Sequence, residues 1–256
     1  MHLLEWQHKE INNMKRSLIF ASRNIKEILR DPLSLIFLLL LPLVMLLLFY
    51  SLFHNLTSQF EIKYFAPGIV VFSCAFITLF SGLLISTDRS SSFLTRLYSS
   101  PLKSYEFILG YFIAMIPISL IQSILFFIVA GILDSSFFSI YLILGVVVSL
   151  FISILFIGFG ILFGSICNEK SIGGISSIVI MCQSILSGMW FPTEGMSDTL
   201  IKIMDYLPFK PATTLLQNVC MGNFDNAFKY LITILIYIII IYVLAILVYS
   251  KKMKEK

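Results

Sequence analysis

The sequence predicts an all-α membrane protein with six transmembrane helices, an interfacial helix near its N-terminus and short re-entrant helices before its last span. Three observations predict this fold class: a mean hydropathy of +0.95, a charged fraction of only 12%, and apolar runs that dominate residues 33–250. A water-soluble domain does not have this composition. No polar stretch is long enough to fold alone, so we predict one membrane domain over residues 33–250.

The spans are predicted from the length of the apolar runs. A helix needs roughly 20 residues to cross about 30 Å of hydrocarbon. Six runs reach this length, at residues 33–53, 65–86, 107–133, 137–166, 172–191 and 228–249. The first run follows a polar, helix-like segment and lacks the short apolar core and small-residue cleavage site of a signal peptide, so we expect no cleaved leader.

The distribution of positive charge predicts that both termini lie in the cytoplasm, because cytoplasmic segments retain Lys and Arg. With the N-terminus inside, fourteen of the eighteen Lys and Arg residues fall in cytoplasmic segments, whereas the acidic residues divide eight to six. We therefore expect a multi-pass protein of the bacterial cell (inner) membrane, with residues 251–256 as a cytoplasmic tail. The net charge of +4 reflects this topology and gives no indication of nucleic-acid binding.

Residues 1–32 are predicted to form a cytoplasmic N-terminus with an amphipathic interfacial helix. Apolar residues recur there at helical spacing, and cations occupy the other faces. The apolar residues are Met14, Leu18, Ala21, Ile25 and Ile28, and the cations are Lys15, Arg16, Arg23, Lys26 and Arg30. The apolar stripe would enter the acyl boundary of the membrane, with the cations near anionic head groups. The alternative is a soluble amphipathic helix that binds a partner protein.

Two connections are too long to be simple turns. The cytoplasmic connection 87–106 mixes charged residues with apolar ones such as Phe93 and Leu97, so it is suited to contact a partner. The outer region 192–227 combines Pro and Gly with short apolar patterns at 200–207 and 212–219. These patterns predict short helices that dip back toward the membrane.

The chemistry that the sequence lacks also limits its function. Apart from Lys229, the second residue of the last one, the six predicted spans contain no Asp, Glu, Lys, Arg or His, which argues against a proton-coupled transporter and an intramembrane hydrolase. The three His and four Cys residues show no metal-ligand or disulfide pattern, so we predict no catalytic residue and no metal site. The sequence has no G-x-x-x-x-G-K-[ST] phosphate loop, so energy for transport must come from a partner.

Uncharged polar and small residues mark the spans instead. In the second predicted span, a small-residue face consists of Ala75, Thr78, Gly82 and Ser86, and a bulky face of Phe72, Phe76, Phe80 and Leu83. One face is expected to pack against other helices and the other to line a path. Gln183 lies deep in the fifth predicted span, where it either bonds a neighbouring helix or lines a path. Gly160 and Gly164 indicate close helix packing in the fourth.

Three motifs resemble the ABC-2 type transporter permeases, the membrane subunits of ABC exporters of the drug- and antibiotic-exporter type. The first is the cytoplasmic segment 88–102, DRSSSFLTRLYSSPL, followed by Tyr105-Glu106 and Gly110. The others are Ala66-Pro67-Gly68 at the start of the second predicted span, and Ser187–Pro192 with Leu207-Pro208-Phe209 after the fifth. The segment departs from the family pattern at Ser90, Ser91 and Ser92, where family members carry acidic residues and a glycine.

This resemblance implies half of an exporter: two permeases, most simply a homodimer, joined to two separate cytoplasmic ATPase subunits that bind ATP and Mg²⁺. The chain would be a transport subunit and not an enzyme. The resemblance assigns coupling to the ATPase to Asp88, Arg89, Arg96, Leu97, Ser100, Pro101, Asn168 and Glu169. It assigns the translocation path to Phe72, Phe76, Phe80, Gln183, Ser187 and Met189, and the outer gate to Trp190, Phe191 and Pro192.

An uncharged, aromatic path suits a hydrophobic or amphipathic cargo, such as a drug, antibiotic, peptide or lipid-like molecule, better than a small hydrophilic ion. We therefore expect ATP-driven export of such a compound. The alternative is a membrane scaffold or immunity factor that does not transport and that sequesters an antimicrobial peptide.

Overall fold

A computed structural model gives the structure of the protein, and it describes residues 2–91, 104–191 and 195–254. Over these residues the protein is helical and contains no strand, which confirms that it is all-α. The helices are α1 His2–Leu29, α2 Pro32–Phe53, α3 Ile62–Ser90, α5 Ser104–Leu133, α6 Tyr141–Ile166, α7 Glu169–Leu186, α8 Asp198–Tyr206, α9 Phe209–Cys220 and α10 Ala227–Lys254, with short 3₁₀ turns η1 Ser58–Phe60 and η2 Ser135–Phe137.

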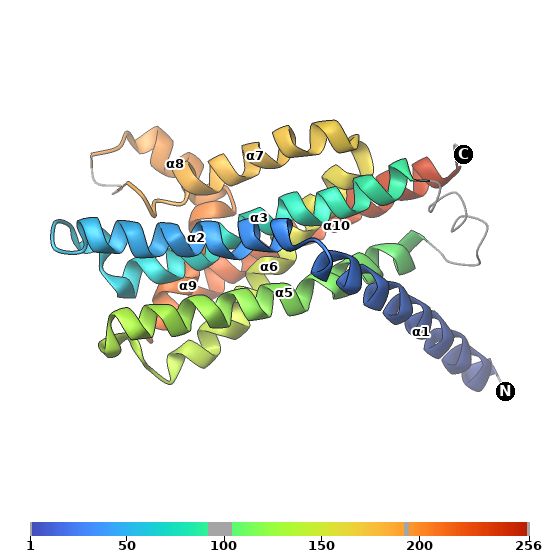
Figure 1. Cartoon of the computed structure of the whole chain (residues 1–256), viewed down its shortest axis with the longest axis horizontal. Coiled ribbons are helices and arrows are strands. Elements are labelled where there is room, and N and C mark those ends of the chain that lie inside the picture. Colours follow the sequence, from blue (N-terminus) through green and yellow to red (C-terminus); the bar gives the residue numbers. More distant parts are fainter. Residues whose placement is uncertain (1, 92–103, 192–194, 255–256) are drawn as a thin grey trace.

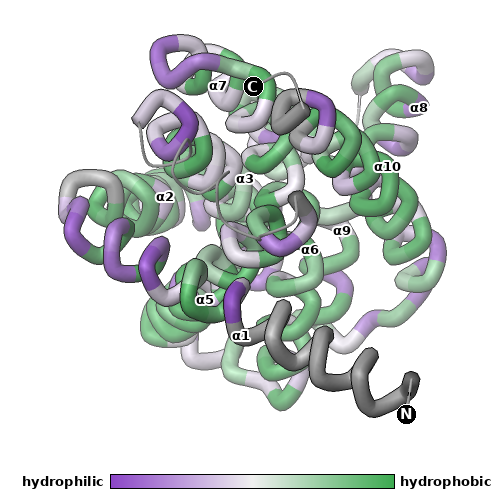
Figure 2. Tube along the Cα trace, turned by 90° about the vertical axis from the view of Figure 1, so that its right-hand side faces the viewer, coloured by the Kyte–Doolittle hydropathy of each residue, from purple (hydrophilic) through white to green (hydrophobic). Residues whose placement is uncertain are grey.

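The long helices form a bundle, and different elements lie at its two ends. Helices α2, α3, α5, α6, α7 and α10 run along the long axis of the molecule, and both chain termini lie at the same end (Figure 1). Helix α1 leaves the bundle obliquely at that end, and α8 lies near the opposite end (Figure 1). Seen from the end with the termini, the bundle helices are mostly hydrophobic, while hydrophilic residues gather on α1 and at helix ends (Figure 2).

Five helices of the described chain are long and apolar enough to cross a membrane. Their apolar segments are Leu35–Phe53, Ile62–Ser90, Tyr105–Leu133, Tyr141–Ile166 and Ala227–Val248. They correspond to the first, second, third, fourth and sixth predicted runs. The fourth helix begins four residues later than predicted, at Tyr141 instead of 137. The reason is the 3₁₀ turn η2, in which the Asp134 carboxylate accepts a hydrogen bond from the Ser136 N–H at 2.9 Å.

The fifth predicted run is not among these five helices. Helix α7 begins earlier than predicted, at Glu169, and so includes the charged Glu169 and Lys170. It also ends earlier, at Leu186, because the chain turns at Gly188, whose φ of 75° lies in the left-handed region that glycine favours. Residues 187–191 are therefore not helical.

Helix α3 is the centre of the bundle. Of its apolar segment 78% is buried inside the protein, against 17% for the segments in α2 and α10. Its small-residue face packs on α6, where the Thr78 hydroxyl donates to the Phe156 carbonyl at 3.0 Å. A Cβ atom on Gly160 would lie 2.6 Å from the Thr78 carbonyl oxygen, and one on Gly164 would lie 2.7 Å from that of Gly82. The predicted packing role of these two glycines is confirmed.

The two predicted short helices before the last long helix are present as α8 and α9. Eight of the twelve residues of α9 are buried, so this helix belongs to the core of the bundle. It contacts α3, α6 and α10. The Gln217 side-chain amide fixes its position by donating to the Tyr64 carbonyl at the start of α3, at 2.8 Å.

Helix α1 packs on α5 through a face that only partly coincides with the predicted apolar stripe, of which Ala21 is buried and Ile28 packs against the core. Phe20 inserts edge-on against Phe107 and Tyr111, with ring centroids 5.5 and 5.0 Å apart. Its ring lies against Gly110, which leaves no room there for a side chain. Leu18 of the predicted stripe is instead 50% exposed. Small or polar neighbours of Phe20 allow this close approach, and they are Ser17, Ala21 and Asn24, all buried.

We expect Gly160→Ala to destabilise the protein by about 1–3 kcal/mol, because its Cβ would overlap the backbone of α3, which cannot move aside. The apparent Tm in detergent, followed by circular dichroism, should fall. Gly174→Ala in α7 is the matched control: a Cβ there meets nothing within 4 Å, so its Tm should stay equal or rise. Equal losses for both variants would contradict the close α3–α6 contact.

Candidate functional site

The end of α3 nearest the chain termini carries a buried carboxylate that joins three helices. Asp88 is only 2% exposed. One of its oxygens, Oδ2, accepts hydrogen bonds from Arg23 Nη1 of α1 at 2.7 Å and from the Tyr111 hydroxyl of α5 at 2.9 Å. We call Arg23, Asp88 and Tyr111 the three-helix clamp. Because a buried carboxylate is costly without partners, the clamp holds α1 and α5 to the end of α3.

Arg23 is more exposed than Asp88, its partner in the clamp. Its Nη2 pairs with Glu27 at 2.6 Å, and its Nη1 also donates to the Asn24 side chain at 2.9 Å. Burial favours the neutral guanidinium, but the hydrogen bond and the negative charge of Asp88 outweigh it and raise the pKa of Arg23. Burial, reinforced by the charge of Asp88, raises the pKa of Glu27. Arg23 therefore stays charged and links the buried Asp88 to the surface of α1.

Arg89, the next residue, reaches a different helix. Its Nη1 donates to the carbonyls of Gly164, Ser165 and Cys167 at 2.7, 2.6 and 3.3 Å. These carbonyls belong to the end of α6, where the last turn of a helix lacks intrahelical donors and favours positive charge. Arg89 thus caps α6 from α3, and the last turn of α3 connects to three helices, α1, α5 and α6.

The predicted coupling residues fall into two groups. Asp88, Arg89 and Glu169 come together at this end of α3, where the Ser90 hydroxyl donates to Glu169 Oε2 at 3.2 Å. Asn168 stands at the N-cap position of α7, without a side-chain capping bond. A cavity of about 490 Å³ separates the helix ends and is lined by Ser86, Arg89, Ser90, Cys167, Asn168, Glu169 and Lys170. Arg96, Leu97, Ser100 and Pro101 lie outside the described residues.

The predicted outer gate is packed into an aromatic cluster. The Trp190 ring lies 4.5, 5.5 and 5.9 Å from the ring centroids of Phe49, Phe65 and Phe72. The chain before it is fixed by Gln59, whose side-chain amide donates to the Gly188 carbonyl at 2.8 Å. The indole N–H of Trp190 is buried without a hydrogen-bond partner. Phe191 is 55% exposed, and Pro192 lies outside the described residues.

The six predicted path residues occupy two layers. Gln183, Ser187, Met189 and Phe72 are buried. Gln183 connects α7 to α9, because its side-chain nitrogen donates to the Thr213 hydroxyl at 3.0 Å, while its side-chain oxygen has no partner. Phe76 and Phe80 are only partly buried and lie on one face of α3. At the end of α3 nearest the chain termini, this face continues into a cavity of about 330 Å³ lined in part by Phe80, Leu83 and Thr87.

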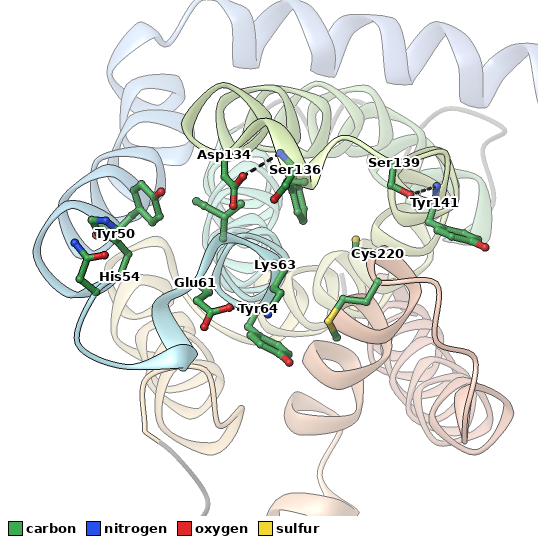
Figure 3. Close-up of a pocket in the computed structure, with 14 residues that line it drawn as sticks. Tyr50, His54, Glu61, Lys63, Tyr64, Asp134, Ser136, Ser139, Tyr141 and Cys220 are labelled. Atoms are coloured by element: carbon green, nitrogen blue, oxygen red, sulfur yellow. Dashed lines mark hydrogen bonds and ion pairs between the residues drawn. The ribbon is translucent and has the colours of Figure 1, made fainter.

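A larger pocket, of about 730 Å³, opens at the opposite end of the bundle (Figure 3). Asp134 and Ser136 lie on one side of it and Glu61 and Lys63 on the other, with Lys63 Nζ 2.7 Å from Glu61 (Figure 3). Hydrogen bonds from Ser136 lower the pKa of Asp134. The lining also contains Tyr50, His54, Asn55, Ile62, Tyr64, Phe137, Ser139, Tyr141, Cys220 and Met221. None of the predicted site residues lines this pocket, and the described residues hold no group of side chains able to bind a metal.

Sequence reasoning missed Arg23 and Tyr111 as members of the site. The sequence pattern places Arg23 among the cations of the N-terminal helix that lie near lipid head groups, and it gives Tyr111 no functional role. The clamp pairs residues that are 65 and 23 positions apart, so no periodicity within one helix could indicate it. The only available signal was an Asp directly after an apolar span, which requires a partner if it is buried.

Comparisons with known proteins place the chain in a family. The model of the family described as ABC-2 type transporter matches residues 17–221, which include most of the described helices. A relative in Cyanophora paradoxa, named "Putative transport permease ycf38", is 36% identical over 93 residues. That match covers 34% of this chain and 32% of the relative, so the chain spans about a third of the length of the relative it matches.

We expect the two charged members of the clamp to differ in their effect on stability. Arg23→Met leaves the buried Asp88 carboxylate without its cation and should cost about 3 kcal/mol of unfolding free energy. Asp88→Asn should cost about 1 kcal/mol, because Arg23 can reach water and the amide still accepts from Tyr111. Denaturant unfolding in detergent measures both.

The matched control for these two variants is Lys63→Gln, which breaks the ion pair between Lys63 and Glu61. The side chains of Lys63 and Glu61 are 51% and 41% exposed. Exposed pairs contribute little, so this variant should unfold like the wild type. Loss of the same free energy in Arg23→Met and Asp88→Asn would show that Asp88 is not buried in the protein as described.

Proposed function

The chain belongs to the ABC-2 type transporter family, and we propose that it is the membrane-spanning permease subunit of an ATP-driven exporter. The observation that carries the proposal is the family match over residues 17–221. A permease of this family transports and is not itself an enzyme, and ABC-2 permeases work with ATPase partners. We propose a homodimer of this chain with two copies of a cytoplasmic ATPase, which binds the ATP and Mg²⁺, in a bacterial cell membrane.

The proposed topology has six spans, with α7 as the fifth in chain order and both termini in the cytoplasm. Support comes from Figure 1, in which the termini share one end of the bundle, as an even number of crossings requires. Helix α7 has 18 residues, or about 27 Å at 1.5 Å per residue, which nearly spans the hydrocarbon. Helix α1 then lies at the cytoplasmic membrane surface, and residues 192–227, with the buried α9, form a re-entrant lid on the outer side.

In this proposal the ATPase contacts the connection 87–106, including Arg96, Leu97, Ser100 and Pro101, together with Asn168 and Glu169 at the start of α7. The contacts of Asp88 and Arg89 then provide the route into the membrane domain. Movement of the connection displaces the end of α3, and the three-helix clamp transmits this displacement to α1 and α5. Arg89 passes the same movement to α6 through the carbonyls that it caps.

The proposed path runs along the partly exposed face of α3, between α2 and α7, and is closed by the second permease. Phe76 and Phe80 form its wall, while Phe72, Gln183, Ser187 and Met189 lie in the layer behind and fix the helices. Trp190, Phe191 and Pro192 form the outer gate. The wall is aromatic and uncharged, which supports a hydrophobic or amphipathic cargo, such as a drug, antibiotic, peptide or lipid-like molecule.

Inverted membrane vesicles that contain the chain and its ATPase partner should take up an amphipathic fluorescent dye or peptide only when ATP is supplied. Replacing the P-loop Lys of the partner should abolish this uptake, because the chain has no phosphate loop of its own. The control is the same pair with an intact ATPase and ADP. Retention of the compound that persists with the inactive ATPase would instead support a sequestering scaffold or immunity factor.

Cysteine labelling tests the path. In a variant whose four native cysteines are replaced, Phe76→Cys should react with a water-soluble thiol reagent and be protected by a transported dye, because its side chain is partly open. Gln183→Cys is the matched control and should react at least about tenfold more slowly, because Gln183 is 0% exposed. If the dye leaves labelling at Phe76→Cys unchanged, Phe76 does not line the path.

A further inference from the structure

The outward face of α1 contains a groove of about 610 Å³ that lies apart from the proposed path and shares only Arg23 with the three-helix clamp. It is lined by Ile19, Ser22, Arg23, Lys26, Glu27 and Arg30. The opposite face of α1, with Phe20 and Asn24, is buried against the bundle. The groove therefore faces away from the protein, along the whole C-terminal half of the helix.

The charges of the groove are not balanced within the protein. Lys26 and Arg30 are exposed, and among the described residues neither side chain has an ion pair or hydrogen bond. Arg23 adds a third positive charge, which it shares with Asp88 and Glu27. Three cations and one carboxylate thus line one groove and leave an excess of positive charge that is suited to an anion.

Apolar side chains lie beside these cations. At about 100° per residue, Leu18 and Leu29 fall at one edge of the outward face and Arg23 and Arg30 at the other. Leu18, Ile19 and Leu29 are 50%, 72% and 62% exposed. Exposed apolar side chains beside unpaired cations match a ligand that has an anionic head and an apolar body.

The position of the groove gives the source of that ligand. Arg30 precedes Leu35, the first residue of the first apolar span, by five residues (35 − 30). The hydrophilic part of α1 stands next to the hydrophobic bundle (Figure 2). The groove is therefore at the level where the head groups of a bilayer surround the bundle.

We propose that this groove binds the phosphate of one anionic glycerophospholipid from the cytoplasmic leaflet. Lys26, Arg30 and Arg23 hold the phosphate, the Ser22 hydroxyl donates to it, and Ile19 contacts the acyl chains. The inference rests on the proposed placement of α1 at the cytoplasmic surface. Arg23 belongs to both the groove and the three-helix clamp. The bound lipid therefore fixes the Arg23 side chain, which joins α1 to Asp88 at the end of α3.

Native mass spectrometry of the full-length chain tests the site directly. The chain in detergent is titrated with phosphatidylglycerol, or with phosphatidylcholine of the same acyl chains. We expect preferential retention of one phosphatidylglycerol per chain. A Lys26→Gln, Arg30→Gln double variant should bind it about 30-fold more weakly, since each cation near a membrane surface contributes about fivefold. Lys202→Gln, at an exposed Lys of α8, is the matched control and should bind as the wild type does.

The double variant could lose binding because it misfolds, so a second variant is expected to bind the lipid more tightly. Glu27→Gln removes the only carboxylate that lines the groove and should tighten phosphatidylglycerol binding about fivefold. Equal retention of both lipids, or no change in either variant, would overturn the proposal. Competition by glycerol phosphate as effective as that by the lipid would show a site for free phosphate instead. The measurement needs no ATPase, so its failure is distinct from failure of the exporter assignment.

Discussion

The structure depends on how one buried carboxylate is satisfied. Asp88 stands where the central helix leaves the apolar layer, and it is 2% exposed. A carboxylate in that position requires a cation and hydrogen-bond donors, and these come from α1 and α5. The constraint fixes the angle at which α1 leaves the bundle and the spacing between α3 and α5. It also concentrates the mechanical links of the permease at the end of one helix, where Arg89 holds α6.

Inside the bundle the packing relies on small and hydroxylated residues, because lipid offers apolar helices no hydrophobic reason to associate. Gly160 and Gly164 let α6 approach the backbone of α3, and Thr78 bonds across that contact. Amides link more distant elements: Gln122 donates to the Leu38 carbonyl of α2, and Gln217 to the start of α3. Side chains without charge thus provide the directional contacts that hold the helices in register.

The sequence allowed much of the fold to be predicted, because a long apolar run has few alternatives to a membrane helix. Five spans, the short helices α8 and α9, and the glycine contact follow from such local patterns. The predictions failed where the orientation or role of a residue depends on a contact with a residue far away in the sequence. Phe20 turns α1 by fitting against Gly110, and a residue 90 positions away cannot be found from helical periodicity. The same holds for Arg23, whose partner Asp88 lies 65 positions away. The assignment of Gln183 to the path stays a prediction, and its side-chain nitrogen donates to the Thr213 hydroxyl.

The central place of α3 has a consequence for biogenesis. Its two main neighbours, α6 and α7, are both made after it, so a nascent α3 enters the bilayer before most of its packing partners exist. Hydroxyls exposed to hydrocarbon at that stage would be costly, yet Ser73 and Ser81 donate to carbonyls of their own helix, at Val70 and Ile77. Helix α3 can thus enter the lipid with these hydroxyls already bonded, and the Thr78 hydroxyl finds its acceptor when α6 is made.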